Sequence, residues 1–219
     1  MCGITGFITS NKEFSNYNLE EILKKMNNSL IHRGPDNGNE IIVNEHNLFM
    51  AFRRLSILDL SDYAMQPMVS SNKNFIMSFN GEIYNFKDLN SKFLNNKYKN
   101  TSDTKVLIEL FSSLGVYKTL DHIEGMFAIS LYDISQKKLY LIRDKVGKKP
   151  LYYYKNNNIF IWSSELKSLH NNPLFEKVVD NKNLSNFLRL GCITGELCIY
   201  ENCKKVEPGY LIEFKNNKI

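Results

Sequence analysis

The first sixty residues contain apolar runs typical of strands and one helical pattern. Residues 4–9 form an apolar run, and the apolar residues of 18–30 recur at helical spacing. Gly34-Pro35 then ends the helix and begins a turn. Residues 40–44 and 48–58 have the composition of two strands around a polar turn. This part of the chain therefore predicts strands and one amphipathic helix.

The rest of the chain is also rich in strands, with a few helices between them. Residues 75–79 predict a strand that Asn80-Gly81 closes, because this dipeptide readily takes positive φ. The other expected elements are helices over 86–95, 103–114 and 182–190 and strands over 126–133, 139–143, 151–154, 159–163 and 210–214. Hairpin strands with helices grouped between them predict a layered α+β fold with antiparallel sheets.

Composition and charge exclude several classes of protein. Of 219 residues, 43% are hydrophobic and 23% are charged, as in ordinary globular proteins. The net charge is +5, but the lysines are scattered among asparagines, without the basic stripe of a nucleic-acid binder. No apolar run approaches the ~18 residues of a membrane span, and no signal peptide precedes position 2. We therefore expect a cytoplasmic protein that binds neither nucleic acid nor membrane.

The cysteines do not have the spacing of a metal or redox site. They are Cys2, Cys192, Cys198 and Cys203, and no two of them form a C-x2-C pair. We therefore expect no bound metal and no redox centre, and we expect the last three to be reduced and to act as small hydrophobes.

Cys2 is the residue with the clearest chemical potential. If Met1 is removed, one residue carries both a thiol and a free α-amine. The thiol has an ordinary pKa of about 8.5 and the amine one of about 7.7–8.0, so the amine can act as the base for its own thiol. The alternative is an inert, buried cysteine, which position alone favours.

Three further segments fit an enzyme that attacks a carboxamide, and each also has an ordinary structural explanation. Arg54 offers a fork for a carboxylate, or it is an exposed residue at a strand end. Asn80-Gly81 offers an amide and an unhindered N–H for an oxyanion, or it is a hairpin turn. Asp103 offers a carboxylate for an ammonium group, or with Ser102 it caps a helix. The combination with Cys2 is more informative than any one of them.

Taken together, these segments resemble the glutamine amidotransferase domain of asparagine synthetases, a class II glutaminase with an N-terminal nucleophile. The likeness is dense over residues 1–170. The segments that carry it are Met1-Cys2-Gly3-Ile4, His32-Arg33-Gly34-Pro35-Asp36, Arg54-Leu55-Ser56-Ile57, Gln66-Pro67, Asn80-Gly81-Glu82-Ile83-Tyr84-Asn85, Ser102-Asp103, Gly125-Met126-Phe127-Ala128, Arg143-Asp144, Gly147, Lys149-Pro150-Leu151-Tyr152, Ser164-Glu165-Leu166-Lys167 and Pro208-Gly209. Other class II amidotransferases share the cysteine start but differ in the arginine and Asn-Gly segments.

The resemblance implies a fold and a role for each matched residue. The fold would be a four-layer αββα sandwich of the N-terminal nucleophile hydrolases, with two stacked antiparallel sheets. Catalysis would fall to Cys2, with Asn80 and Gly81 as the oxyanion hole. The substrate-binding residues would be Arg54 for the α-carboxylate, Glu82 and Asp103 for the α-ammonium, and Leu55 and Ile57 through their backbones. The segments 33–36 and 143–152 would be mainly scaffold.

The resemblance also implies what the chain works with. Residues 2–219 would form a glutaminase domain that needs no cofactor and supplies ammonia for asparagine biosynthesis or for amidation of a related acid. ATP and Mg²⁺ would be needed only in a synthetase domain, whose pyrophosphate-binding motif does not occur in this sequence. The chain would thus be a fragment, an excised domain or a free-standing subunit that works with a synthetase partner, and a homodimer is possible. The alternative is a catalytically inactive glutaminase-like domain that docks on a synthetase subunit.

Overall fold

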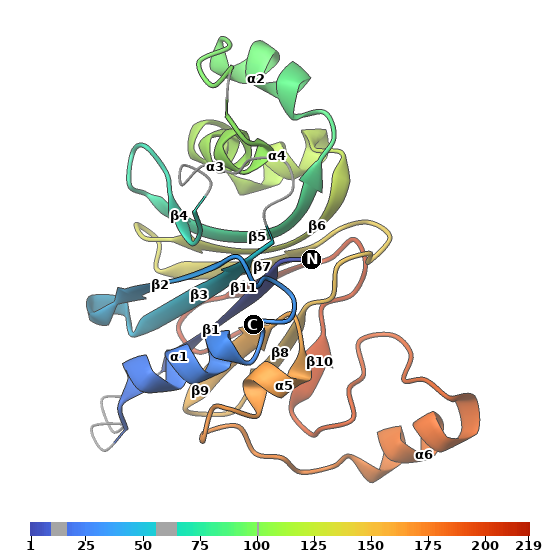
Figure 1. Cartoon of the computed structure of the whole chain (residues 1–219). Coiled ribbons are helices and arrows are strands. Elements are labelled where there is room, and N and C mark those ends of the chain that lie inside the picture. Colours follow the sequence, from blue (N-terminus) through green and yellow to red (C-terminus); the bar gives the residue numbers. More distant parts are fainter. Residues whose placement is uncertain (10–16, 56–64, 100) are drawn as a thin grey trace.

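Two antiparallel sheets lie face to face, and helices cover both outer sides (Figure 1). This is the arrangement in a computed structural model, which describes residues 1–9, 17–55, 65–99 and 101–219. The predicted α+β class and the four αββα layers are therefore confirmed.

The first sheet places the start of the chain at its centre. Its six strands are, in order, β10 (Cys203–Lys205), β8 (Tyr152–Lys155), β9 (Ile159–Ser163), β1 (Gly3–Thr9), β3 (Leu48–Arg54) and β2 (Asn37–Val43). β1 pairs with β9 on one side and with β3 on the other, so Cys2 stands at the start of a strand that is held along both edges. A short 3-10 turn, η2 (Asn44–His46), joins β2 to β3.

The second sheet is built on a long hairpin. Its five strands are, in order, β11 (Leu211–Phe214), β7 (Lys138–Arg143), β6 (Gly125–Asp133), β5 (Phe75–Ile83) and β4 (Met68–Val69). β5 and β6 pair over nine residues, from Phe75 opposite Asp133 to Ile83 opposite Gly125. β4 pairs only near the start of β5, at Ile76 and Met77, so the later part of that edge of β5 extends beyond it.

Helices form the outer layers. α1 (Leu19–Asn28) and α5 (Leu166–Leu169) pack on the first sheet, while α3 (Asp103–Leu114) packs on β5 and is flanked by α2 (Phe86–Leu94) and α4 (Val116–His122). α6 (Asn181–Leu190) lies at the side of the first sheet (Figure 1). Asn18 and Ser102 begin α1 and α3 as N-caps, because their side chains accept hydrogen bonds from the N–H three residues on.

Three apolar clusters hold the four layers together. One lies between the sheets, one between the second sheet and α2–α4, and one between the first sheet and α1 and α5. Alternation along β5 separates two of them: Met77 and Phe79 belong to the helix-side cluster and Ile76 to the cluster between the sheets. The same alternation directs Ser78, Asn80 and Glu82 toward the first sheet.

Most predicted elements are confirmed to within a few residues, but the prediction at Asn80-Gly81 is wrong. These residues do not form a turn: β5 continues through them to Ile83. Asn80 lies opposite Ala128 and Gly81 opposite Phe127 in an unbroken ladder. A Cβ at Gly81 would lie 2.1 Å from the Met126 carbonyl oxygen. Close approach of β6, rather than turn geometry, thus requires glycine here.

The sequence patterns missed four short elements: β4, α4, α5 and β10. β4, α5 and β10 have four residues or fewer, too few for an apolar period to be recognised. The strand predicted over 48–58 is described as far as Arg54, and its positions 56–58 lie outside the described residues.

Candidate active site

Cys2 lies at the end of β3, against the backbone of Leu55. Gly3 is opposite Arg53, so the register of β1 and β3 brings Cys2 to the level of Arg54. The Leu55 N–H donates to Cys2 Sγ at 3.4 Å, and Sγ lies 3.7 Å from the Leu55 carbonyl oxygen. The Leu55 backbone therefore contacts Cys2, and its predicted contact with the substrate stays a prediction. Ile57 lies outside the described residues.

The environment of Cys2 favours the neutral thiol. Burial raises its pKa above the usual value, and this outweighs the Leu55 hydrogen bond and the positive charges of the N-terminus, Arg54 and Arg33, which lower it. A neutral thiol needs a base before it can attack. The α-amine that removal of Met1 would free on the same residue is such a base.

Arg33 holds the main chain of Cys2, a role that the sequence reasoning missed. Its side chain is buried, and its Nε donates to the Cys2 carbonyl oxygen at 2.9 Å. Glu165 fixes the other side of the guanidinium through Nη1 at 2.8 Å, and His32 also contacts Glu165. The family resemblance implied only a scaffold role for Arg33, and a contact between residues 31 positions apart leaves no local signal in the sequence.

Asn80 presents an unpaired amide to the space between the sheets. The residue is 2% exposed, and its Nδ2 has no hydrogen-bond partner within residues 1–9, 17–55, 65–99 and 101–219. Cys2 packs against the cluster between the sheets, which includes Ala128, the residue opposite Asn80. A buried N–H without a partner is unusual in folded proteins and points to a group that completes it.

Gly81 directs its N–H away from β6, to the same edge of β5 as the N–H groups of two neighbours that side chains bind. Tyr84 N–H donates to the Glu124 carbonyl oxygen across the ladder, so Phe79, Gly81 and Ile83 direct their N–H groups away from β6. The Phe79 N–H donates to Gln66 Oε1 at 2.6 Å and the Ile83 N–H to Asp103 Oδ2 at 3.0 Å. Gly81 lies between these two side-chain anchors.

The start of α3 adds negative charge at this edge. Asp103 is the first residue of α3, and it accepts from the Ile83 N–H and, at 2.7 Å, from the Thr104 N–H. Burial raises the pKa of Asp103, its hydrogen bonds lower it, and the negative charge of Glu82 raises it further. Glu82 and Asp103 are therefore close enough to repel each other, which suits a cation placed between them.

The structure thus brings the predicted residues to one end of the sandwich, from both sheets. Cys2, Leu55 and Arg54, whose side chain is buried, come from the first sheet. Asn80, Gly81 and Glu82 come from the second sheet, and Asp103 is attached to it. Such a set can activate a thiol, bind an oxyanion and hold both charged groups of an amino acid.

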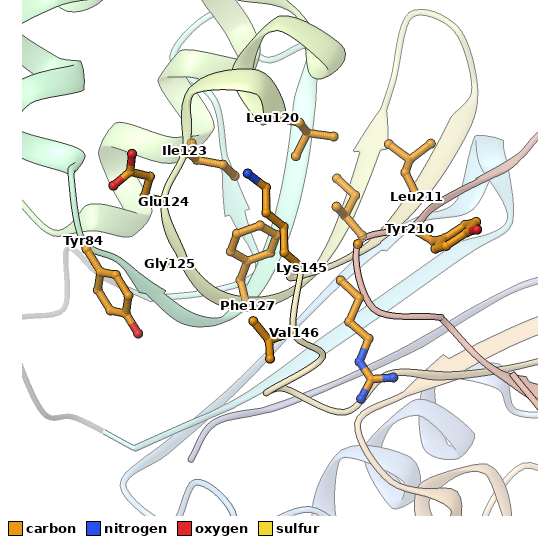
Figure 2. Close-up of a pocket in the computed structure, with 13 residues that line it drawn as sticks. Tyr84, Leu120, Ile123, Glu124, Gly125, Phe127, Lys145, Val146, Tyr210 and Leu211 are labelled. Carbon is orange, nitrogen blue, oxygen red and sulfur yellow. The ribbon is translucent and has the colours of Figure 1, made fainter. Parts of the chain in front are cut away.

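A cavity of about 340 Å³ lies nearby but on the other face of the second sheet (Figure 2). Phe127, Ile142 and Leu211 line it, and they belong to or pack against the helix-side cluster, whereas Cys2 packs against the cluster between the sheets. The body of the sheet therefore separates this cavity from the nucleophile, and we assign it no part in the candidate site.

Two further properties of the described residues bear on the class of protein. Within these residues, no group of three or more His, Cys, Asp or Glu side chains is arranged to hold a metal ion. In the same part of the chain, none of the helices is both long and apolar enough to span a membrane.

Comparison with known families decides the class. The family model described as "Glutamine amidotransferase domain" matches residues 1–219. The chain belongs to this family. The resemblance drawn from the sequence motifs is therefore confirmed, and with it the class II amidotransferase type of enzyme.

Curated relatives point to the same branch. The chain is 38% identical to "Asparagine synthetase [glutamine-hydrolyzing] 2" of Bacillus subtilis over 79% of its own length and 23% of that protein. It is 35% identical to "Putative asparagine synthetase [glutamine-hydrolyzing] 2" of Methanocaldococcus jannaschii over 100% of its length and 45% of that protein. The chain spans less than half the length of these relatives.

Solved structures support the fold. The glutamine phosphoribosylpyrophosphate amidotransferase of Bacillus subtilis superposes with a TM-score of 0.62 at 15% identity, over 98% of this chain and 49% of that one. A structure described as the allosteric regulatory enzyme of purine biosynthesis gives the same TM-score at 17% identity, over 78% of this chain and 43% of that one. Likeness at this identity is evidence for the sandwich architecture alone.

Proposed function

We propose that this domain of the glutamine amidotransferase family hydrolyses glutamine through Cys2 and supplies ammonia to an ATP-dependent synthetase. Cys2 Sγ attacks the side-chain amide carbon of glutamine, ammonia leaves, and water hydrolyses the γ-glutamyl thioester to glutamate. The α-amine of Cys2, freed by removal of Met1, takes the thiol proton and returns a proton to the leaving group.

The observation that carries this proposal is the buried Asn80 Nδ2, which has no hydrogen-bond partner among the described residues. An oxyanion hole consists of donors fixed in advance where negative charge develops. Asn80 Nδ2 is such a donor, in the space between the sheets against which Cys2 packs. The Gly81 N–H, which points away from β6, would supply a second donor. We propose that these two groups form the oxyanion hole.

The charged residues give the site its selectivity for a free amino acid. Arg54 would bind the α-carboxylate through its planar fork, and Glu82 and Asp103 would bind the α-ammonium. The arrangement of these charges is complementary to a zwitterionic amino acid. The cation, Arg54, lies at the end of the first sheet, and the anions, Glu82 and Asp103, lie on or next to the second sheet. Leu55 and Ile57 would add backbone contacts.

The destination of the ammonia follows from the relatives' names. Because the chain spans less than half of proteins named glutamine-hydrolysing asparagine synthetases, we propose that a synthetase domain or subunit activates aspartate or a related acid with ATP and Mg²⁺. The glutaminase step itself would need neither. We place the reaction in the cytoplasm.

Glutamate release by the purified chain tests the proposal. The native chain should convert glutamine to equimolar glutamate and ammonia, and Cys2→Ala should lose this activity with an unchanged melting temperature. Cys192→Ser is the matched control, since Cys192 is exposed and lies in another part of the fold. Full activity in Cys2→Ala would refute Cys2 as the nucleophile, whereas a folded native chain that releases no glutamate would favour the inactive docking domain.

A further inference from the structure

Two of the cysteines outside the candidate active site flank an antiparallel bridge of one hairpin. Leu197 and Lys204 form an antiparallel bridge, and the Lys205 N–H donates to the Glu196 carbonyl oxygen at 2.7 Å. In this register the next facing pair is Cys198 and Cys203, joined by a turn of four residues. The spacing in sequence gave no sign of a pair, because the hairpin, rather than a C-x2-C motif, brings the two together.

The place of this pair beside the Leu197–Lys204 bridge favours a disulfide between them. Facing residues of antiparallel strands have Cα atoms about 4.5–5.5 Å apart, and disulfides span Cα distances of about 4.4–6.8 Å. The two thiols are close enough for each to shift the pKa of the other. Both cysteines are free.

The surroundings give the two thiols different chemistry. The neighbouring Cys203 thiol lowers the pKa of Cys198 to about 7, against the opposing effect of burial, and the charge of Lys205 contributes. The neighbouring Cys198 and burial raise the pKa of Cys203. Cys198 is thus the more acidic and more nucleophilic of the two thiols.

We propose that Cys198 and Cys203 form a modification site, a dithiol that hydroperoxides convert to an intramolecular disulfide. The Cys198 thiolate attacks one peroxide oxygen, which breaks the O–O bond, releases hydroxide or alkoxide and leaves a sulfenic acid. Cys203 sulfur then attacks Cys198 sulfur, forming the S–S bond and releasing water as the Cys203 proton joins the departing hydroxide. The peroxide is reduced by two electrons and the two thiols are oxidised.

Burial makes the site selective for small reagents. Cys198 and Cys203 are only 3% and 4% exposed, whereas Cys192 is exposed. Hydrogen peroxide can therefore reach the pair more readily than a bulky alkylating reagent can. Cys198 also anchors α6, because Asn183 Nδ2 donates to its carbonyl oxygen at 2.8 Å. A disulfide would close the hairpin to which α6 is attached.

Peptide mapping of the full chain tests the site without reference to glutaminase activity. The Cys2→Ala chain is treated with hydrogen peroxide at neutral pH, remaining thiols are alkylated in denaturant, and the protein is cleaved after glutamate without reduction. Cleavage after Glu196, Glu201 and Glu207 places Cys192, Cys198 and Cys203 in three separate fragments. We expect fragment 197–201 to be joined to fragment 202–207.

Single variants separate the role of the thiol that attacks the peroxide from the role of the thiol that forms the disulfide. In Cys203→Ser, oxidation should stop at a Cys198 sulfenic acid that dimedone traps; in Cys198→Ser, Cys203 should remain a thiol. Cys192→Ser, the matched control, should form the linkage as the parent does. The proposal is overturned if the folded parent keeps both thiols while Cys192 is oxidised, or if the linkage joins Cys192, or if it forms only in unfolded protein. The parent chain alone decides these outcomes if a variant does not fold.

Discussion

Replacing Asn80 by alanine removes one proposed oxyanion donor while disturbing little else. Asn80 Nδ2 makes no hydrogen bond within the described part of the chain, so no protein group there loses a partner from that atom. The strand pairing of β5 with β6 uses the main chain and is unaffected by the side chain. The change should therefore act on the transition state far more than on the fold.

The expected loss follows from what such donors contribute. One lost oxyanion donor lowers kcat about 10²- to 10³-fold, which corresponds to about 2.7–4 kcal/mol of transition-state stabilisation. The KM for glutamine should change little, because the uncharged carbonyl oxygen of the substrate gains less from the donor than the oxyanion does. The melting temperature should remain close to that of the native chain.

Ser78→Ala provides the matched control. Ser78 lies two residues earlier on the same face of β5, and its buried Oγ likewise lacks a partner in the described residues. Steady-state glutamate release, measured with a coupled dehydrogenase, should be normal in Ser78→Ala and slow in Asn80→Ala. An unchanged kcat in Asn80→Ala, or an equal loss of kcat in Ser78→Ala, would show that Asn80 is not an oxyanion donor.

Three further variants test the charged groups. Arg54→Lys keeps the positive charge but loses the planar fork of the guanidinium. A lost charge-assisted hydrogen bond costs about 1.5–3 kcal/mol, so the KM for glutamine should rise about 10- to 150-fold. An unchanged KM would exclude Arg54 from the site. Arg33→Lys keeps the positive charge but loses the Nε–H that donates to the Cys2 carbonyl oxygen. The kcat should therefore fall about tenfold or more at constant KM. A change in KM alone would contradict this role of Arg33. The pKa of Asp103 is raised above the usual aspartate pKa of about 3.9, so its carboxylate is protonated at a higher pH than usual. The KM for glutamine should therefore rise as the pH falls through that raised pKa, and Asp103→Asn should lack this dependence. Identical pH profiles of KM in the two chains would refute this role of Asp103.

The fold was largely predictable because its strands are long enough to show a pattern. β9 and the helix α3 were placed at their observed bounds, since runs of apolar residues and a capping Ser102 mark them. β10 was missed, because it has three residues and a lysine-rich sequence, and only its pairing with β8 makes it a strand. Such pairing is a property of the assembled sheet and has no local sign.

For the candidate site, residue identity was predictable and geometry was not. Cys2, Arg54, Asn80 and Asp103 were selected by their chemistry, and the structure places them at one end of the sandwich. The direction of the Gly81 N–H depends on the β5–β6 register, which the turn predicted at Asn80-Gly81 had excluded. The contact of Arg33 with Cys2 depends on how α1 and β1 pack.

Labelling with a glutamine-mimicking electrophile, followed by mass analysis of the N-terminal peptide, tests the central claim most directly. We expect a single label on a peptide that begins at Cys2, without Met1, and protection of that peptide by glutamine. An active protein that retains Met1, or a label that glutamine does not prevent, would contradict it.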